Sequence, residues 1–269
     1  MLPETPTLEL RPAGGWLEIR LNRPEARNAL SPELVADLRA VFAAIRDDRS
    51  VRGVTLRGNG GTFCAGGDLK GFRDTLQAAG DRDAVIAQSL DGARLFAEAD
   101  SLPQVVVAVV EGAAMAGGFG LACCADAAIV QVDAKFGFSE TAIGLSPAQI
   151  APYVMAKLGP AVARRLLLTA ERFDGREAAR LGFADILCET PEEIANAEAR
   201  LRRQVLRCAP GAVAETKALL ATLRTLTTQQ ARAEAAAEVF ADRMTSDEGR
   251  EGVASFLEKR KPAWAEAPE

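Results

Sequence analysis

Residues 105–131 read VVVAVVEGAAMAGGFGLACCADAAIVQ, and this stretch decides the fold class. The apolar run Val105–Val110 is typical of a strand that is buried on both faces, as in a parallel sheet. A glycine-containing turn follows, then an apolar helix through Cys124, and then a second strand at Ala127–Gln131. Strand, glycine loop, helix and strand in this order predict an α/β protein.

The same alternation continues toward the N-terminus. Trp16–Leu21 alternates apolar and polar residues and predicts a strand, and Val51–Arg57 predicts another. Between them, Ser31 followed by a proline is typical of a helix N-terminus, and this helix is expected to reach about Asp47. A polar helix is expected over residues 72–100. The apolar face of the first helix would consist of Leu34, Leu38, Val41, Phe42 and Ile45.

After about Pro147 the pattern becomes mostly helical, with one short strand near Ala184–Cys188. The expected helices cover residues 148–158, 160–170, 175–181, 191–208, 212–224, 227–243 and 247–259. A helical C-terminal part often supplies a lid or an oligomer contact. We therefore expect a core over residues 1–200 and a helical region over residues 201–269.

The composition excludes several classes of protein. Hydrophobic residues make up 48% of the 269 residues and charged residues 26%, which excludes a disordered chain. The longest apolar run is shorter than the roughly 20 residues of a membrane helix, and the N-terminus lacks the pattern of a signal peptide. The net charge of −5 argues against nucleic acid as a main partner.

The chain contains no histidine, and this excludes histidine-based triads and histidine metal sites. Its five cysteines are odd in number and form no CxxC pair, which argues against a disulfide or zinc framework. We therefore expect no metal, reduced thiols buried as small apolar residues, and a cytoplasmic location. Any catalysis would depend on carboxylates, backbone N–H groups or hydroxyls.

Two glycine loops each follow a strand and lead into a helix. The first is GGTFCAGGDL at residues 60–69, and the second is Ala116-Gly117-Gly118. Glycines allow backbone N–H groups to turn outward, and two that converge can stabilise a carbonyl oxygen that gains charge. From spacing alone, tight turns with only a structural role are the stronger interpretation. Neither loop fits a nucleotide-binding motif.

Glu140 is the candidate acid or base. It stands in Phe136–Thr141, between a short apolar strand and a turn. A carboxyl group in apolar surroundings can have a raised pKa and act as a general acid or base. A solvated or helix-capping glutamate is the alternative, and the local sequence leaves it open.

Several blocks, in order and at matching spacing, resemble the enoyl-CoA hydratase/isomerase family, the crotonase superfamily. The matching blocks are LNRPEARNAL (21–30), FCAGGDL (63–69), Glu111–Asp126, Phe136–Gly144 and FLEKRK (256–261). The resemblance covers nearly the whole chain. It implies an α/β fold built as a crotonase-like spiral of ββα repeats, with a helical C-terminal region that forms homotrimers or dimers of trimers. It also implies an acyl-CoA thioester substrate and no further cofactor.

By motif, the backbone N–H groups of Gly67 and Gly117 would form an oxyanion hole for the thioester oxygen. Glu140 matches the second of two glutamates that the family's hydratases commonly use around one water. The first of those two glutamates aligns with Gly120 of this chain. The resemblance therefore implies one carboxylate here where those hydratases have two. Glu111 stands too far upstream in the motif to replace it.

The resemblance also implies contacts with coenzyme A. The residues that match lie in three stretches and are Arg27, Ala29, Ala65, Asp68, Leu69, Phe256 and Lys259. The last two can reach the nucleotide end of coenzyme A, sometimes from a neighbouring subunit. A surface charge at Arg27, a helix cap at Asp68 and a helix-end charge at Lys259 are the alternatives.

Residues 139–152, SETAIGLSPAQIAP, resemble the bacterial glutaconyl-CoA hydratase branch of the family. Substrates of that branch, isohexenylglutaconyl-CoA and 3-methylglutaconyl-CoA, carry a distal carboxylate and a branch at C3. The resemblance therefore implies a hydro-lyase that adds water across their C2=C3 bond. A one-base enoyl-CoA isomerase and a non-catalytic acyl-CoA-binding protein are the alternatives, and the absence of histidine argues against a serine peptidase.

Overall fold

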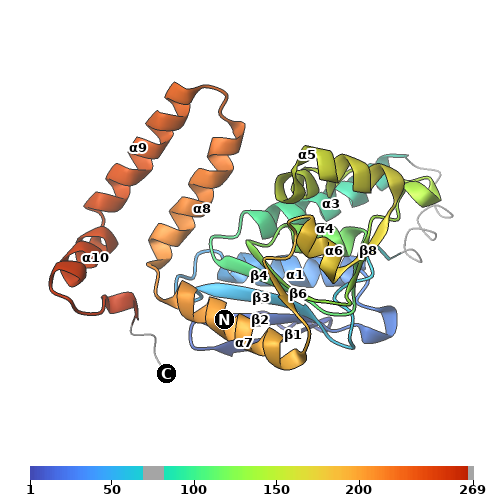
Figure 1. The fold of residues 1–269 in the computed structure, drawn as a ribbon, viewed down its shortest axis with the longest axis horizontal. Coiled ribbons are helices and arrows are strands. Elements are labelled where there is room, and N and C mark those ends of the chain that lie inside the picture. Colours follow the sequence, from blue (N-terminus) through green and yellow to red (C-terminus); the bar gives the residue numbers. More distant parts are fainter. Residues whose placement is uncertain (69–81, 266–269) are drawn as a thin grey trace.

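The computed structural model describes residues 1–68 and 82–265 (Figure 1). Its main sheet has six strands in the order β1-β2-β3-β4-β6-β9. The β1–β2 pair is antiparallel and the other pairs are parallel, which confirms the predicted α/β class. The strands are β1 (Leu8–Ala13), β2 (Trp16–Leu21), β3 (Gly53–Gly58), β4 (Val105–Val110), β6 (Ala127–Gln131) and β9 (Ile186–Cys188).

Both faces of the central strand β4 are buried, as its unbroken apolar sequence predicts. Val106 and Val110 belong to the main core, which also contains the buried face of helix α1. Val107 and Val109 belong to a second cluster, which contains Ile194 of helix α7. Successive side chains of a strand point to opposite faces, so one apolar run supplies both layers.

Helices cover the two faces of the main sheet. The N-terminus of α1 is capped as expected, because the Ser31 hydroxyl accepts a hydrogen bond from the Leu34 N–H at 3.2 Å. All five residues predicted for its apolar face are buried. The helices of the body are α1 (Pro32–Ile45), α3 (Arg82–Asp100), α4 (Gly117–Cys123), α5 (Ala151–Thr169), α6 (Gly175–Arg180) and α7 (Pro191–Leu206), with short 3₁₀ turns η1 (Pro24–Ala26) and η2 (Thr141–Ile143).

A second, smaller sheet carries the segments that lead to the site. It consists of β5 (Ala113–Met115), β7 (Lys135–Gly137) and β8 (Arg172–Asp174). β5 and β7 run parallel, and β8 is antiparallel to β7. The carboxyl ends of β5 and β7 therefore lie at the same edge of this sheet.

Most predicted elements are confirmed, with shifted ends. The two helices expected over 148–158 and 160–170 form one element, α5, which is interrupted at Gly159, where φ is 76° and ψ is 157°. The first part of the helix expected over 72–100 lies outside the described residues. The boundary expected at residue 200 falls within α7, which packs against β6 and β9.

Three helices form an arm that extends away from the sheet (Figure 1). They are α8 (Pro210–Thr225), α9 (Gln229–Thr245) and α10 (Asp247–Leu257), followed by a turn η3 (Ala263–Ala265). The base of the arm is fixed by Lys217, whose Nζ donates to Asp126 Oδ2 at 2.6 Å and to Gln104 O at 3.2 Å. None of the helices in the described part of the chain is long and apolar enough to cross a membrane.

Candidate active site

The first glycine loop exposes the N–H group of Gly67. The carbonyl oxygen of Gly66 accepts a hydrogen bond from the Leu30 N–H at 2.8 Å. The N–H of Gly67 belongs to the same trans peptide group, so it points in the opposite direction, away from Leu30. No described residue accepts a hydrogen bond from it.

The second loop exposes the N–H group of Gly117, the first residue of α4. The carbonyl oxygen of Ala116 accepts from the Gly120 N–H at 3.0 Å, so the N–H of Gly117 points out of the helix. Ala116 has φ 49° and ψ −125°, a conformation that residues other than glycine rarely adopt. Such strain costs roughly 1–3 kcal/mol and clusters at active sites.

The two loops are in direct contact. A Cβ atom built on Gly66 would lie 3.5 Å from the nitrogen of Gly117, and one built on Gly117 would lie 3.8 Å from the nitrogen of Gly67. A Cβ atom on Gly118 would lie only 2.6 Å from the Cβ of Cys64, so glycine is required there for the close approach. The structure therefore brings the N–H groups of Gly67 and Gly117 to one narrow space.

Cys64, in the middle of this contact, does not supply a nucleophile. Its side chain is fully buried, and this burial raises the pKa of the thiol to about 12. The thiol is therefore protonated at neutral pH. Cys123, Cys124 and Cys188 are also buried free thiols, as expected, whereas Cys208 is exposed.

Glu140 lies at the same edge as Gly117. The N–H of Ala116 donates to Gly137 O at 2.8 Å, and Glu140 follows Gly137 by three residues. The Oε2 atom of Glu140 is buried and has no hydrogen-bond partner among the described residues. Burial raises the pKa of this carboxyl group above its ordinary value, as the apolar neighbours predict.

Aromatic packing fixes the strand that leads to Glu140 against α4. Phe119 of α4 lies with its ring centroid 5.0 Å from that of Phe136 and 4.8 Å from that of Phe138. All three rings are fully buried. Close-packed aromatic pairs resist displacement, so the helix that carries the Gly117 N–H and the segment that carries Glu140 keep a fixed relation.

The position of the missing glutamate is filled by another side chain. A Cβ atom built on Gly120 would lie 2.2 Å from Cγ2 of Ile150, which is itself buried. No side chain can stand at residue 120 unless Ile150 moves. Residue 120 therefore supplies no carboxylate to this site, and an apolar side chain occupies the place where one would begin.

The variant Gly120→Ala tests this packing. Overpacking a core typically costs about 1–3 kcal/mol, so we expect a loss of that size in the free energy of unfolding, measured with denaturant. Combining it with Ile150→Ala should destabilise less than the two single losses added together, because the second change makes room for the first. Strict additivity would show that Ile150 does not occupy this space.

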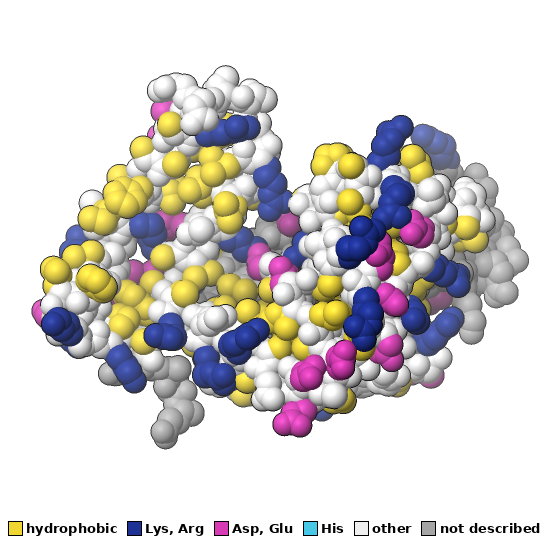
Figure 2. Space-filling view, viewed as in Figure 1, with side chains coloured by type: hydrophobic (Ala, Val, Ile, Leu, Met, Phe, Trp, Pro, Cys, Tyr) yellow, Lys and Arg dark blue, Asp and Glu magenta, His cyan; other side chains and the backbone are white. Residues whose placement is uncertain are grey.

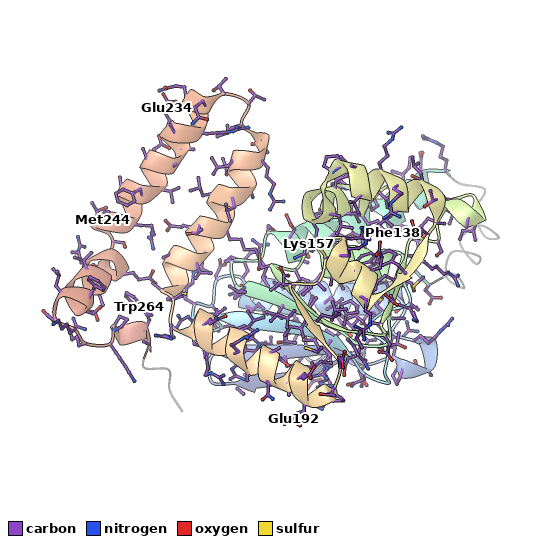
Figure 3. The ribbon with its side chains drawn as sticks, in the orientation of Figure 1. Phe138, Lys157, Glu192, Glu234, Met244 and Trp264 are labelled. Atoms are coloured by element: carbon purple, nitrogen blue, oxygen red, sulfur yellow. The ribbon has the colours of Figure 1, made fainter. Side chains whose placement is uncertain are left out.

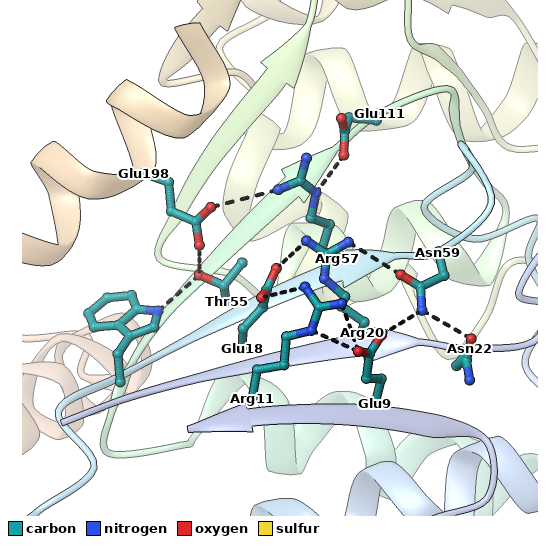
Figure 4. A network of polar contacts seen from close by, with 11 residues as sticks. Glu9, Arg11, Glu18, Arg20, Asn22, Thr55, Arg57, Asn59, Glu111 and Glu198 are labelled. Atoms are coloured by element: carbon teal, nitrogen blue, oxygen red, sulfur yellow. Dashed lines mark hydrogen bonds and ion pairs between the residues drawn. The ribbon is translucent and has the colours of Figure 1, made fainter. Parts of the chain in front are cut away.

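Glu111 does not replace the missing carboxylate. Its Oε2 atom accepts from Arg57 Nε at 2.5 Å, and Arg57 also lies 3.9 Å from Glu198 of α7 (Figure 4). Thr55 extends this network, because its hydroxyl donates to Glu198 and accepts from the Trp16 indole N–H. The carboxylate of Glu111 is thus engaged between the sheet and α7.

Four of the residues expected to contact coenzyme A adjoin the first loop. The N–H of Ala65 donates to Arg27 O at 3.0 Å, and the N–H of Asp68 donates to Leu30 O at 3.4 Å. Ala29 precedes Leu30, so the structure brings Arg27, Ala29, Ala65 and Asp68 together. Leu69 lies outside the described residues.

Phe256 and Lys259 are not brought to this site within one chain. Phe256 lies at the end of α10 and Lys259 just after it, in the arm, whereas Gly117 begins α4 in the body of the molecule (Figure 1). Phe256 is 83% exposed. Any contact of these two residues with an acyl-CoA at the glycine loops would therefore involve another copy of the chain.

The sequence analysis missed the role of Asn28, which organises the first loop. Its side chain is fully buried, and its Nδ2 donates to Asn59 O at 2.9 Å and to Thr62 O at 2.7 Å. Its backbone has a positive φ of 54°. An asparagine in a turn tolerates this conformation, and that is the one signal by which it could have been found.

Comparison with known proteins identifies the family. The model of the family described as "Enoyl-CoA hydratase/isomerase" matches residues 12–267. A carnitinyl-CoA dehydratase of Proteus mirabilis is 33% identical, covering 96% of this chain and 98% of the relative. A crotonyl-CoA hydratase of Syntrophomonas wolfei is 31% identical, covering 90% of this chain and 91% of the relative.

Solved structures agree with the sequence relatives. Pseudomonas aeruginosa AtuE is 47% identical with a TM-score of 0.93, covering 97% of this chain and 100% of that one. An enoyl-CoA hydratase/isomerase from Marinobacter aquaeolei is 41% identical with a TM-score of 0.91, covering 97% and 99%. The chain therefore belongs to the enoyl-CoA hydratase/isomerase family and has the crotonase-type α/β fold that its motifs predicted.

Proposed function

We propose that this protein is an enoyl-CoA hydratase that uses Glu140 as its single acid and base. The observation that carries this proposal is the buried Oε2 atom of Glu140, which has no hydrogen-bond partner among the described residues and lies at the edge where the Gly117 N–H is exposed. A buried carboxyl oxygen without a partner is costly, and such atoms are retained where a ligand or water completes their hydrogen bonding. The family relationship supplies the thioester chemistry.

In the proposed reaction, the thioester oxygen accepts hydrogen bonds from the N–H groups of Gly67 and Gly117. Glu140 orients a water molecule and takes one of its protons while the hydroxide adds to C3. The C2=C3 electron pair moves toward the thioester, so the oxygen gains charge in the enolate, and the two N–H groups bind it more strongly than in the substrate. Protonated Glu140 then returns the proton to C2, and one water has been added.

We further propose a branched, carboxylated enoyl-CoA as substrate, of the isohexenylglutaconyl-CoA or 3-methylglutaconyl-CoA type. One feature of the structure supports an apolar acyl group. The segment that contains Glu140 continues into Ile143 and Leu145, which are 56% and 47% exposed and can contact an apolar acyl group. The substrate's own carboxylate, or a water network, would supply the polar group that Gly120 cannot carry.

A panel of thioesters in ¹⁸O-labelled water tests the reaction and the substrate together. We expect loss of the conjugated double bond and one ¹⁸O atom in the product, with glutaconyl-type thioesters turning over faster than crotonyl-CoA. Double-bond migration without ¹⁸O would establish the one-base isomerase instead. Thioester binding without any turnover would establish the non-catalytic alternative.

The coenzyme A part of the substrate would enter along Arg27, Ala29, Ala65 and Asp68, mainly against backbone atoms. The resemblance gives Leu69 the same role. Coenzyme A is part of the substrate, and the proposed reaction uses no further cofactor. The five free thiols support a reducing compartment, and we propose the cytoplasm.

We propose that the arm assembles copies of this chain into a homotrimer or a dimer of trimers. Large apolar side chains are exposed along it (Figure 2): Leu220, Phe240, Met244, Val253, Phe256 and Leu257. Contiguous apolar surface of this kind marks a protein interface. The arm would also bring Phe256 and Lys259 to the coenzyme A of a neighbouring copy.

Light scattering on the purified protein tests the assembly. We expect a mass of three or six times the 28.4 kDa chain. Phe240, 67% exposed on α9, should be critical, so Phe240→Glu is expected to lower the mass. The variant Glu238→Gln on the same helix is the control and should leave the mass unchanged. A monomeric wild-type protein would contradict the proposal.

A further inference from the structure

A cleft lies between α7 and the chain that follows α10, on the side where the arm joins the body. Its volume is about 740 Å³. Figure 2 shows Lys and Arg side chains gathered on the lower side of the molecule in this region. The polar residues that line this basic cleft are Arg200, Arg203, Gln204, Arg207, Arg260 and Lys261.

Among the described residues, few carboxylates compensate the charge of the basic cleft. Arg200 and Arg203 of α7 and Arg207, which caps its C-terminus, are spaced three and four residues apart, so they lie on one side of the helix and repel one another. In the described part of the chain, neither these arginines nor Lys261 forms an ion pair with a carboxylate. This concentration of positive charge occurs in a chain whose net charge is −5.

The helix dipole favours Arg203 and Arg207, which stand at the C-terminal end of α7, but it does not account for the rest of the cluster. A cation is favoured at a helix C-terminus only within about the last turn. Arg200 precedes the end of α7 at Leu206 by six residues, and Lys261 lies beyond α10 on the other wall of the cleft. The cations come from two separate segments and repel one another. A bound anionic ligand would offset this repulsion.

The wall formed by residues 258–265 is held in place. Arg260 donates to Glu251 Oε1 and Oε2 at 2.6 and 2.8 Å and to Glu258 Oε2 at 2.6 Å. The Trp264 indole N–H donates to Arg207 O at 3.2 Å, which joins this wall to the end of α7 (Figure 3). A preformed cleft loses less conformational entropy when a ligand binds, because its walls are already ordered.

The basic cleft is separate from the candidate active site. The guanidinium group of Arg202 bonds to Ala13 O, just before β2, so this part of α7 lies at the amino end of β2. The first glycine loop follows the carboxyl end of the neighbouring parallel strand β3. The two places therefore lie at opposite edges of the main sheet.

We propose that the basic cleft is a second binding site, which takes a small molecule with two or more linked phosphate groups, such as a nucleoside diphosphate. A guanidinium group can form two parallel hydrogen bonds to the oxygens of one phosphate. The three arginines follow one another at intervals of about one helical turn, so they can contact neighbouring phosphates. The volume lies in the range of small-molecule sites. A free nucleotide and the nucleotide end of coenzyme A share this chemistry.

Titration calorimetry on the full chain tests the proposal with ADP, pyrophosphate and adenosine. We expect ADP and pyrophosphate to bind, more weakly as salt is raised, and adenosine not to bind. Arg203→Gln combined with Arg207→Gln should weaken pyrophosphate binding about tenfold or more. Arg164→Gln, an exposed arginine on α5, is the matched control and should leave binding unchanged. The kcat for the thioester should stay unchanged in all three proteins, because none of the substituted residues belongs to the glycine loops or lies beside Glu140.

Coenzyme A in the same titration distinguishes the two sources. If the double variant weakens coenzyme A binding as well, the ligand is the nucleotide end of coenzyme A, and if it weakens only ADP and pyrophosphate, the ligand is a free nucleotide. Pyrophosphate binding that is equal in the wild type and the double variant would overturn the proposal. So would failure of both phosphate ligands to bind.

Discussion

Replacing Glu140 by Gln is expected to lower kcat by about 10²–10⁴-fold, the usual contribution of a positioned acid or base. The dissociation constant for the thioester should change little, because the N–H groups of Gly67 and Gly117 remain. Single-turnover kinetics and equilibrium binding measure the two quantities separately. A variant that keeps the full rate would remove Glu140 from the mechanism.

Stability measurements on the same variant separate catalysis from folding. Burial raises the pKa of Glu140, so the ionised carboxylate destabilises the folded state at pH values above that raised pKa. Gln carries no charge, and the variant should therefore be at least as stable as the wild type at neutral pH. The difference should vanish at acidic pH, where the carboxyl group is protonated in both states. A variant that is less stable than the wild type at neutral pH would contradict the claim that burial of the ionised carboxylate destabilises the folded state.

The wild-type rate should show the same raised pKa. The base must be ionised to take a proton from water, so kcat/KM, which reports ionisation of the free enzyme, is expected to fall as the pH is lowered through this pKa. A rate that is flat from neutral pH down to the ordinary pKa of glutamate would argue against Glu140 as the base.

Replacing the Gly117 amide by an ester, through incorporation of glycolic acid at residue 117, is expected to lower kcat by about 10²–10³-fold. The ester lacks the N–H donor, and losing one oxyanion-hole donor costs about 2.7–4 kcal/mol of barrier. No side chain is added, so the contact with the first glycine loop is preserved. Rates of hydration with an enoyl-CoA thioester measure the effect.

The matched control is the same ester at Gly61. Gly61 lies in the first loop but is exposed, and none of the described residues accepts a hydrogen bond from its N–H. This ester should leave kcat within about twofold of the wild type, as expected for a surface change. Equal losses at both positions would indicate a general effect of esters on folding, and no loss at residue 117 would exclude its N–H from the oxyanion hole.

The elements that follow local rules could be predicted from the sequence. The cap at Ser31 and the 3.6-residue spacing of Leu34, Leu38 and Phe42 fix α1 without reference to the rest of the chain. The unbroken apolar run of β4 indicates burial on both faces. Glycine-rich turns between such elements pointed to Gly67 and Gly117, although only the family resemblance assigned them a shared role.

The relations that complete the site could not be predicted, because they depend on tertiary contacts. β5 and β8 are three residues long, too short for a period to be recognised, yet the pairing of β5 with β7 places Glu140 beside α4. The packing of Ile150 over Gly120 joins positions 30 residues apart. The backbone of Ala116 is strained because two contacts fix it at once. Its N–H donates a hydrogen bond to Gly137 O, and its carbonyl group begins helix α4.

A crystal structure of the Glu140→Gln variant with a bound enoyl-CoA thioester tests the central claim most directly. The account predicts that the thioester oxygen lies within about 3.2 Å of the backbone nitrogens of both Gly67 and Gly117. It also predicts that C3 faces the side chain at residue 140. A thioester oxygen bound elsewhere, or a C3 atom remote from residue 140, would contradict it.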